Sequence, residues 1–367
     1  MLAESRIFWA GQGVAEERYS AQILSSPEAV MALSNRAQHL LQGRESTCDP
    51  LFFLASIETP VWIPRVVSVE EAGHIVGILY AKERKYKGVP LGIYFADGSL
   101  GSMMVADEDR RERILETAIR KLWKRPGRRS LRVLMPPDSC EDVAFRKSFA
   151  SDAGKTVDVR YSAVENHCVL DLPQEYECFL NSLGKQSRRN FRYYRRKSEG
   201  AGWKYVERMS PIEFREVALR LLAKDVIGAD RSGLTRALNM LSCTSRPIMI
   251  GLKGEDGEWV SILGGWYEYD RAVVFCQMNN EKDYPDSSLS IVLRGYLIES
   301  LIQSGVAKLL FWAGIGPPLL RHCHFLPTTG AYFDSRRIHW RLVRALLPRI
   351  NWLLSPRLKY LSSWIVD

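Results

Sequence analysis

The order of the predicted elements repeats in the two halves of this 367-residue chain, and this repeat constrains the fold more than any single motif. Each half shows helix, helix, antiparallel strands, helix and strand, as judged from apolar periodicities of 3.6 and 2. We therefore predict an α/β (α+β) fold of two tandem units, each a mixed, mostly antiparallel sheet flanked by helices. No residue-level repeat accompanies the element order, so order alone supports the duplication.

Ser26 and Ser210 are the expected N-caps of two predicted helices, and Pro126-Gly127 and Gly305 end two others. The predicted strands are short apolar runs bounded by turn residues. In the first half the expected helices are 26–41, 49–57 and 107–124, and the expected strands are 65–70, 74–81, 91–95, 102–105 and 130–135. In the second half the expected helices are 173–200, 210–222, 234–241 and 286–303, and the expected strands are 166–172, 247–252, 259–267, 272–278 and 308–312. The expected domains are 1–165, 166–334 and a basic amphipathic C-terminal segment, 335–367.

A basic run within the second half has helical spacing. Seven of the thirteen residues of Lys185–Lys197 are basic and none is acidic. On a helix, Lys185, Arg188 and Arg192 share one stripe, opposite an apolar face. Like charges at this spacing cost about 0.2–0.5 kcal/mol per pair, so an anionic partner would explain the stripe. We expect these three residues to bind a substrate or donor; a solvated basic face is the alternative.

Two basic patches account for the formal net charge of +9. The Lys185–Lys197 run contributes +7, and Ser335–Val366 contributes another +7, which leaves −5 for the rest of the chain. Such patches attract phosphates, nucleic acid or anionic lipid. The C-terminal segment could contact a membrane surface peripherally through its apolar helical face, or pack as a terminal helix.

The cysteines indicate a reducing compartment. There are seven, an odd number, and no C-x-x-C pair occurs. The N-terminus lacks the apolar core of a signal peptide. No uncharged apolar run reaches the ~18 residues that a membrane span needs. We expect a cytoplasmic protein without a transmembrane segment. Peripheral contact at the inner face of the membrane through residues 335–367 is the alternative to packing of this segment as a terminal helix.

A more specific pattern follows the basic run. A hairpin with Ile262–Trp266 comes next, then Tyr284–Ser288 opens a helix, and a strand leads into Gly314. Over roughly residues 20–330 this resembles the tandem-GNAT proteins of the FemAB-like and CelD-like kind. The sequence departs from the family pattern at Leu310, where members often have Asp. The family's Tyr-Lys pair and the glycine-rich phosphate loop of ordinary GNAT enzymes are absent.

The resemblance implies an N-acyltransferase in cell-envelope or polysaccharide biosynthesis. The donor would be acyl-CoA, with aminoacyl-tRNA as the alternative, and the acceptor a small-molecule or lipid-linked amine. Transfer would be direct, without a covalent intermediate, and without a metal. Other classes stay open: a non-catalytic GNAT-like partner protein, or an anion- or nucleic-acid-binding module.

Acyl transfer to an amine requires removal of a proton, stabilisation of the carbonyl oxygen and positioning of the reactants. The predicted helix start at Asp286 offers N–H donors for an anion. We therefore expect Tyr284 and Ser288 to be catalytic and Ser287 to bind the donor. Plain N-capping by Asp286 or Ser287 is the alternative.

Further candidates surround that junction. Gln277 and Asn279 lie two apart at a strand end, so both side chains point to the same side; turn capping is the alternative. Tyr267 is a candidate pocket hydroxyl. His322 is a candidate general base, and with His324 it could form a metal pair, but no further ligand has suitable spacing. We expect no metal.

Overall fold

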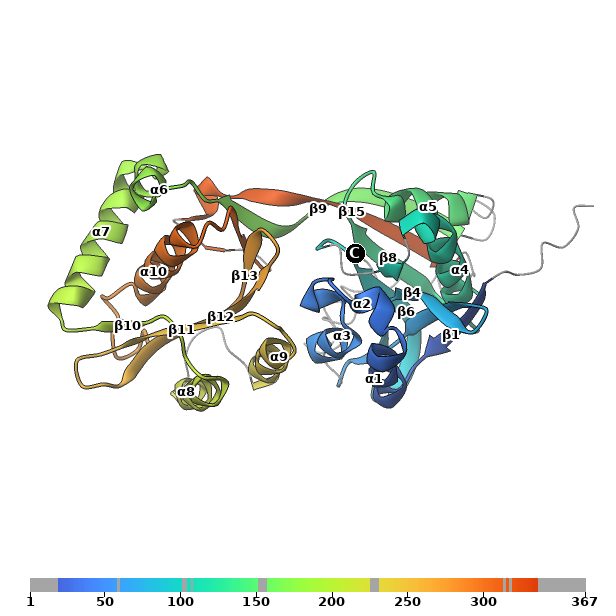
Figure 1. Cartoon of the computed structure of the whole chain (residues 1–367), viewed down its shortest axis with the longest axis horizontal. Coiled ribbons are helices and arrows are strands. Elements are labelled where there is room, and N and C mark those ends of the chain that lie inside the picture. The colour runs from blue at the N-terminus through green and yellow to red at the C-terminus, as the bar shows by residue number, and fades with distance from the viewer. Residues whose placement is uncertain are drawn as a thin grey trace, which may run out of the picture.

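The computed structural model shows two α/β halves that are joined by two long antiparallel strands, β9 (Val157–Asp171) and β15 (His324–Ser335) (Figure 1). Both strands run from one half into the other. The structure describes residues 19–57, 60–100, 104–106, 108–150, 157–224, 231–312, 315–316 and 319–335. The C-terminal segment expected at 335–367 therefore lies outside the described residues, apart from Ser335 at the end of β15.

The first half lies at the right of Figure 1. Its helices are α1 (Pro27–Arg36), α2 (Gln38–Leu41), α3 (Pro50–Ser56), α4 (Arg111–Trp123) and α5 (Cys140–Ala150), with 3-10 turns at Ser46–Cys48 and Glu108–Arg110. Its strands are β1 (Ser20–Leu24), β2 (Trp62–Pro64), β3 (Val66–Glu71), β4 (His74–Leu79), β5 (Lys82–Tyr86), β6 (Val89–Asp97), β7 (Met104–Ala106) and β8 (Ser130–Met135).

The second half lies at the left. Its helices are α6 (Tyr176–Ser182), α7 (Lys185–Gly200), α8 (Pro211–Ala223), α9 (Arg231–Ser242) and α10 (Leu289–Gln303), with a 3-10 turn, η3, at Leu319–His322. Its strands are β10 (Lys204–Val206), β11 (Pro247–Lys253), β12 (Trp259–Glu268), β13 (Arg271–Asn279) and β14 (Lys308–Phe311).

The two halves repeat one feature of sheet topology. Each contains one parallel strand pair, β6 with β8 and β13 with β14, and in each the intervening chain includes a long helix, α4 or α10. The other strand pairings in the described ranges are antiparallel. The predicted fold class, two α/β units of mixed and mostly antiparallel sheet with flanking helices, is confirmed.

The strands form one small and one large sheet. The small sheet has the order β1-β3-β4-β7, and the large one β10-β11-β12-β13-β14-β9-β15-β8-β6-β5-β2. The large sheet passes from one half to the other through β9 and β15. The boundary expected between residues 165 and 166 therefore falls inside a strand that both halves share.

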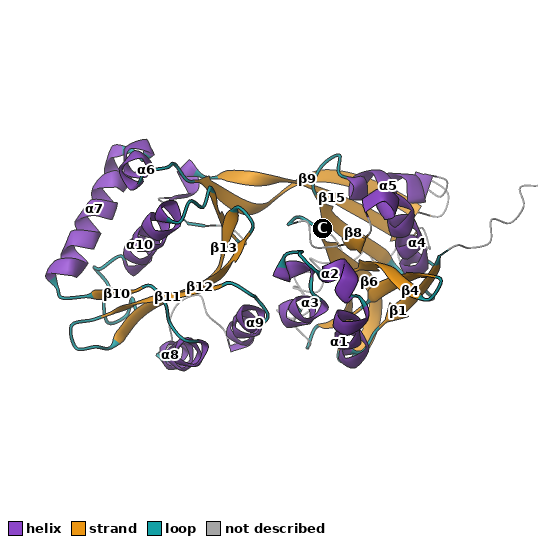
Figure 2. Ribbon diagram, in the orientation of Figure 1, coloured by secondary structure: helices purple, strands orange, loops and turns teal. Residues whose placement is uncertain are grey.

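Helices cover both faces of the sheet in the second half (Figure 2). On the α10 side, Leu263 of β12 packs in one apolar cluster with Leu293. On the α8 and α9 side, Trp266 packs with Phe214. Phe52 of α3 joins this second cluster, with its ring centroid 5.3 Å from that of Trp266. Burying a phenylalanine contributes about 1.5–3 kcal/mol, so this contact helps to hold the halves together.

Three predicted helices differ in the structure. The helix expected at 173–200 is broken at Leu183, whose extended backbone (ψ 146°) separates α6 from α7 and lets both helices pack on α10. The helix expected at 26–41 is interrupted at Ala37. The helix expected from Asp286 starts only at Leu289, because Ser288 has a left-handed backbone (φ 44°).

The sequence patterns did not indicate several elements: β1, β2, β5, α5, β10 and β15. β5 shows why, because its buried side chains are charged rather than apolar. Glu83 accepts a 2.6 Å hydrogen bond from Arg65 Nε, and both side chains are buried. Hydrophobic periodicity does not detect a strand of this kind. β15 contains Pro327, which weakens a strand prediction.

Candidate functional site

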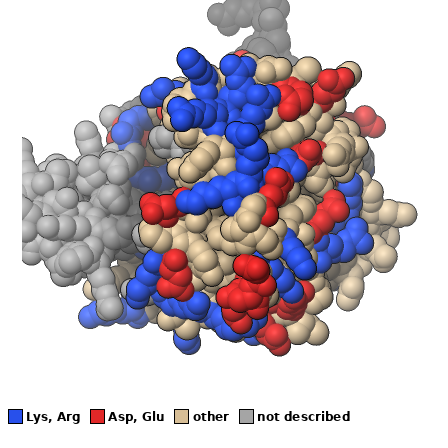
Figure 3. Space-filling view, turned by 90° about the vertical axis from the view of Figure 1, so that its left-hand side faces the viewer, with Lys and Arg blue, Asp and Glu red and all other residues tan. Residues whose placement is uncertain are grey.

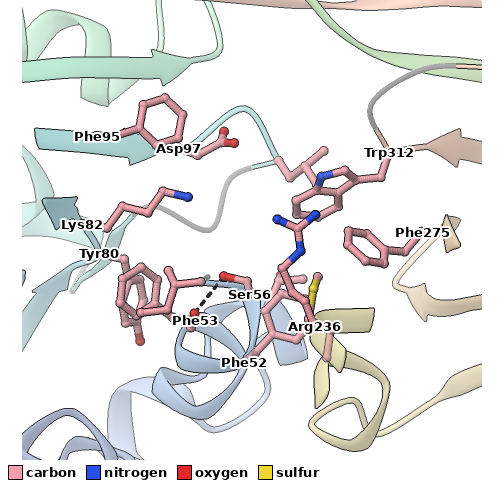
Figure 4. A pocket seen from close by; sticks show the side chains of 14 residues that line it. Phe52, Phe53, Ser56, Tyr80, Lys82, Phe95, Asp97, Arg236, Phe275 and Trp312 are labelled. Carbon is pink, nitrogen blue, oxygen red and sulfur yellow. Dashed lines mark hydrogen bonds between the residues drawn. The ribbon is translucent and has the colours of Figure 1, made fainter. Parts of the chain in front are cut away.

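A cavity of about 160 Å³ lies between the two halves (Figure 4). The first half contributes side chains from α3, β5 and β6, and the second half contributes side chains from α9, β13 and the residue after β14. Aromatic rings make up much of the lining: Phe52, Phe53, Tyr80, Phe95, Phe275 and Trp312. Three charged side chains stand among them: Lys82, Asp97 and Arg236. The cavity is therefore apolar in its body and carries a few polar groups, as ligand sites do.

Asp97 ends β6, and it is the one carboxylate among the residues that line the cavity. Its Oδ1 accepts hydrogen bonds from Ser99 N (3.1 Å) and Ser99 Oγ (2.6 Å). Ser99 Oγ in turn lies 3.1 Å from His167 Nε2, on β9. These two hydrogen bonds fix the orientation of the Asp97 carboxyl group at the wall of the cavity.

Two cations stand across from Asp97 in Figure 4. Lys82 Nζ lies 4.7 Å from the ring centroid of Trp62 and 5.1 Å from that of Phe95. The Arg236 guanidinium lies 5.4 Å from the ring centroid of Phe275. Aromatic faces attract cations at such distances and hold them in place. Lys82 and Arg236 can therefore bind the anionic part of a ligand.

The cavity adjoins the point where β13 and β14 part. Their parallel pairing ends at Val274 and Phe311, and Trp312 N then donates to Val274 O at 3.0 Å. β13 continues to Asn279 while paired only with β12, within the described strands. Main-chain N–H and C=O groups on that side of β13 are thus available to a ligand.

Gln277 and Asn279 lie on this free stretch of β13 and point to the same side, as predicted. Gln277 Nε2 donates to Asn279 Oδ1 at 3.1 Å, and Ser261 Oγ donates to the same oxygen at 2.7 Å. Gln277 Oε1 is buried and has no hydrogen-bond partner within the described residues. A buried acceptor without a partner costs about 1–3 kcal/mol, so this oxygen is suited to a ligand or a water molecule.

Tyr284, Ser287 and Ser288 form the loop that enters α10. The Tyr284 ring packs edge-on against Trp203 at 5.3 Å. Ser288 occupies the N-cap position of α10 but makes no side-chain capping hydrogen bond. The alternative of capping by Asp286 or Ser287 is wrong, because the helix begins after both. The N-terminus of α10 keeps N–H groups and a partial positive charge, the features that bind anions.

The predicted anion-binding residues of α7 lie apart from this loop. Lys197, at the C-terminal end of α7, donates to Asp286 O at 2.9 Å. Lys185 lies twelve residues earlier, about 18 Å along the helix at 1.5 Å per residue. Arg188 bonds to Asn181 Oδ1, and Arg192 pairs with Glu177 at 2.5 Å.

Lys and Arg side chains gather on the end of the molecule seen in Figure 3. Lys185, Arg189 and Arg196 are exposed on α7, and Arg192 is 46% exposed. An ion pair between exposed partners, such as Arg192 with Glu177, contributes about 0–1 kcal/mol and exchanges readily for another anion. No residue of α7 lines the cavity, so this basic surface of α7 is separate from it.

Tyr267 and His322 do not line the cavity. The Arg246 guanidinium lies 4.9 Å from the Tyr267 ring centroid, and burial raises the pKa of the Tyr267 phenol. His322 lies on η3, and His324 Nδ1 lies 3.4 Å from Asp171 Oδ2. Among the described residues, no three His, Cys, Asp or Glu side chains gather in a way that could hold a metal ion.

The structure also bears on membrane contact and on thiol chemistry. Within the described ranges, no helix combines the length and the apolar composition that crossing a bilayer requires. None of the seven cysteines, all within the described residues, forms a disulfide bond. Burial raises the pKa of the Cys276 and Cys323 thiols to about 12 each. Neither thiol ionises at neutral pH, so neither is an activated nucleophile.

The sequence analysis did not identify the cavity residues Lys82, Asp97 and Arg236, or Ser99 and His167 behind them. It placed the site wholly in the second unit, whereas Lys82 and Asp97 come from the first. One local signal was present: Asp97 and Ser99 flank a glycine directly after an apolar strand. Polar residues at a strand end commonly carry function.

A comparison with family models and with curated proteins found no match to the sequence. Solved structures do match. FemX aligns with a TM-score of 0.56 and 8% identity over 89% of this chain and 99% of that chain. L-PGS from Bacillus licheniformis aligns with a TM-score of 0.53 and 14% identity over 87% of this chain and 95% of that chain.

A third structure is the C-terminal domain of a putative lysylphosphatidylglycerol synthetase from Agrobacterium fabrum. It aligns with a TM-score of 0.53 and 13% identity, over 89% of this chain and 97% of that chain. None of these comparisons bears on the CelD-like part of the resemblance. At such low identity the similarity establishes the fold alone, and the chain has the tandem fold of FemX and L-PGS.

Proposed function

We propose that this protein is an acyltransferase that passes an acyl or aminoacyl group directly to an amine in the cavity between its two units. The observation that carries the proposal is the position of Asp97, the one carboxylate of the cavity lining, near the point where β13 and β14 part. With the division proposed at residue 166, Asp97 belongs to the first unit and Trp312 to the second. Side chains from both units are then required to form the cavity.

Asp97 would act as the general base. An amine nucleophile must lose a proton as it attacks the donor carbonyl, and a carboxylate at the wall of an apolar cavity can accept that proton. Lys82 and Arg236 would hold the anionic part of the acceptor or donor. The aromatic lining excludes water, which strengthens these interactions.

The donor would approach from the α10 side of β13. The free edge of β13 offers N–H groups to the donor carbonyl, and the N-terminus of α10 offers a positive site for its phosphates. We propose that Gln277, Asn279, Ser287 and Ser288 bind the donor here, and that Tyr284 lines its path. Acyl-CoA and aminoacyl-tRNA both carry phosphates that fit this arrangement.

Direct transfer is supported by the buried thiols. A covalent intermediate needs an activated nucleophile, and burial keeps Cys276 and Cys323 protonated. His322 would then have no thiol nucleophile to deprotonate, and it does not line the cavity. Its assignment as a general base stays a prediction, secondary to Asp97.

A role in cell-envelope biosynthesis is the further part of the proposal. One structure of the same fold is named as the C-terminal domain of a putative lysylphosphatidylglycerol synthetase, a name that describes a lipid bearing a lysyl group. The basic surface of α7 would hold an anionic macromolecule, either tRNA or a membrane with anionic lipid. Lys197, at the C-terminal end of the same helix, contacts the donor loop at Asp286 O. A lipid-linked amine would then reach the cavity from the same membrane.

The test is a transfer assay with the purified chain. Acyl-CoA and aminoacyl-tRNA donors are offered with a panel of small and lipid-linked amines, and products are identified by mass spectrometry. We expect one donor class to be used and Asp97→Asn to lower kcat/KM by about 100-fold or more. Asp138→Asn, outside the cavity lining, is the matched control and should retain full activity. Full activity in the Asp97 variant would refute the proposed site.

One observation favours a second function, that of an anion- or nucleic-acid-binding module. The basic surface of α7 is exposed and lies away from the cavity. If no donor is consumed while nucleic acid binds with strong salt dependence, this second function replaces the first.

A further inference from the structure

Three polar side chains form a chain of hydrogen bonds from the interior to the wall of the cavity. Ser99 Oγ lies 2.6 Å from Asp97 Oδ1 and 3.1 Å from His167 Nε2. Ser99 is 3% exposed and His167 is 1% exposed, whereas Asp97 lines the cavity. This series of hydrogen bonds joins β6 of the first unit to the shared strand β9.

The number of hydrogen atoms on each group determines which group donates and which accepts in these hydrogen bonds. An ionised carboxylate can only accept, and a hydroxyl has a single hydrogen. Ser99 therefore donates to Asp97 Oδ1 and accepts from His167 Nε2–H. Burial lowers the pKa of His167; the charge of Asp97 opposes this effect and that of Arg271 adds to it. The imidazole is thus neutral and protonated on Nε2.

The rest of the surroundings hold this geometry in place. Asp97 Oδ1 accepts two hydrogen bonds from Ser99, while Asp97 Oδ2 has no hydrogen-bond partner within the described part of the chain. The His167 ring packs at 5.3 Å against Trp312, which itself lines the cavity. One oxygen is therefore fixed and the other is left for a ligand.

We propose that Ser99 and His167 are positioning residues that orient Asp97 toward the nucleophile of the acceptor. This inference rests on the proposed function. The amine gives a proton to Asp97 Oδ2 while its nitrogen bonds to the donor carbonyl carbon. The bond from that carbon to the thiolate or alkoxide leaving group breaks, and the leaving group takes the proton from Asp97. The products are an amide and a free thiol or alcohol, and the enzyme is restored.

The first experiment measures kcat/KM against pH for Ser99→Ala, with Ser99→Thr as the matched control that keeps the hydroxyl. We expect Ser99→Ala to lose about tenfold, or 1.4 kcal/mol, in kcat/KM. The shape of its pH profile should also change, because the carboxyl group that acts as the base loses one hydrogen-bond donor. Ser99→Thr should keep the wild-type profile. The double variant Asp97→Asn, Ser99→Ala should have the same kcat/KM as Asp97→Asn alone, because Ser99 acts through Asp97.

Two results would show that Ser99 has a merely structural role and would overturn the inference. One is a loss of kcat/KM in Ser99→Ala that is the same at all pH values. The other is a loss in the double variant that is larger than the loss in Asp97→Asn alone. A second measurement needs no activity: ¹⁵N NMR of the imidazoles, with His167 assigned from His167→Gln. We expect an Nε2–H imidazole in the wild type and a loss of that preference in Ser99→Ala. An Nδ1–H imidazole in an enzyme that still depends on Asp97 refutes the positioning chain alone. Full activity in Asp97→Asn refutes the proposed function, and this inference with it.

Discussion

Arg195 Nη1 donates a 2.6 Å hydrogen bond to Glu299 Oε2, which ties the basic helix α7 to α10. Arg195 Nε also bonds to Glu199 Oε1, and the guanidinium lies 4.3 Å from the ring centroid of Tyr296. One cation of the basic run is thus committed to helix packing, whereas Arg189 on the same helix is exposed. The charges of this run have different roles despite their similar sequence context.

This difference gives the first prediction. Arg195→Gln should lower the free energy of unfolding by about 1–3 kcal/mol, because it leaves a half-buried carboxylate without its partner. Arg189→Gln should change it by less than about 0.5 kcal/mol. Urea denaturation of both variants measures the difference. Equal stabilities would mean that the contact between Arg195 and Glu299 does not hold α7 in place.

The second prediction concerns the basic surface of α7. Replacing Lys185, Arg188 and Arg192 with Gln should weaken binding to tRNA or to anionic vesicles and flatten its salt dependence. Each lost phosphate contact reduces the magnitude of the negative slope of log K against log salt concentration by about 0.7–0.9. The matched control, with Arg113, Arg120 and Lys124 of the first half changed to Gln, removes the same charge from another surface. If both triple variants lose affinity equally, only net charge matters.

The third prediction follows from Glu45, a carboxyl group at the contact between the two halves. Burial, and then the charge of Glu268, raise the pKa of Glu45 from 4.5 to about 7, although Arg271 opposes this. The folded protein therefore binds more protons than the unfolded chain between these pH values. Stability is unaffected by Glu45 below pH 4.5 and falls as the pH rises toward 7.

Glu45→Gln should therefore be more stable than the wild type at pH 8, by a few degrees in Tm, and the gain should shrink at pH 5. Thermal unfolding at the two pH values measures this. Glu255→Gln, an exposed carboxylate in a hairpin turn, is the control. A gain for Glu45→Gln that is the same at both pH values would contradict the assignment of the titrating group.

The fourth prediction locates the donor. The double variant Gln277→Ala, Ser288→Ala should stay folded and lose about tenfold in transfer, or 1.4 kcal/mol in the barrier, chiefly through a weaker donor interaction. Gln303→Ala with Ser304→Ala, at the exposed far end of α10, is the matched pair. Wild-type kinetics in the first variant would place the donor elsewhere than the junction of β13 and α10.

The sequence by itself predicted the parts that depend on local periodicity. The apolar stripe of α4, including Ile114 and Leu122, is buried as its 3.6-residue spacing requires. The β11–β13 meander also lies where alternation placed it. The repeated element order was sufficient to predict two α/β units. Gln277 and Asn279 share a side because the strand period of two requires it.

The tertiary structure decided what depends on residues far apart in the chain. Asp97 and Trp312 line one cavity and His167 lies behind them, although 70 and 145 residues separate the three in sequence. They meet because β9 and β15 pair along both units, and no local pattern specifies that pairing. The start of α10 at Leu289 depends on a left-handed backbone at Ser288. Local spacing determines which face of a helix or strand is apolar. Which other element packs against that face depends on burial across the whole fold. The candidate site forms only where elements from both units pack together.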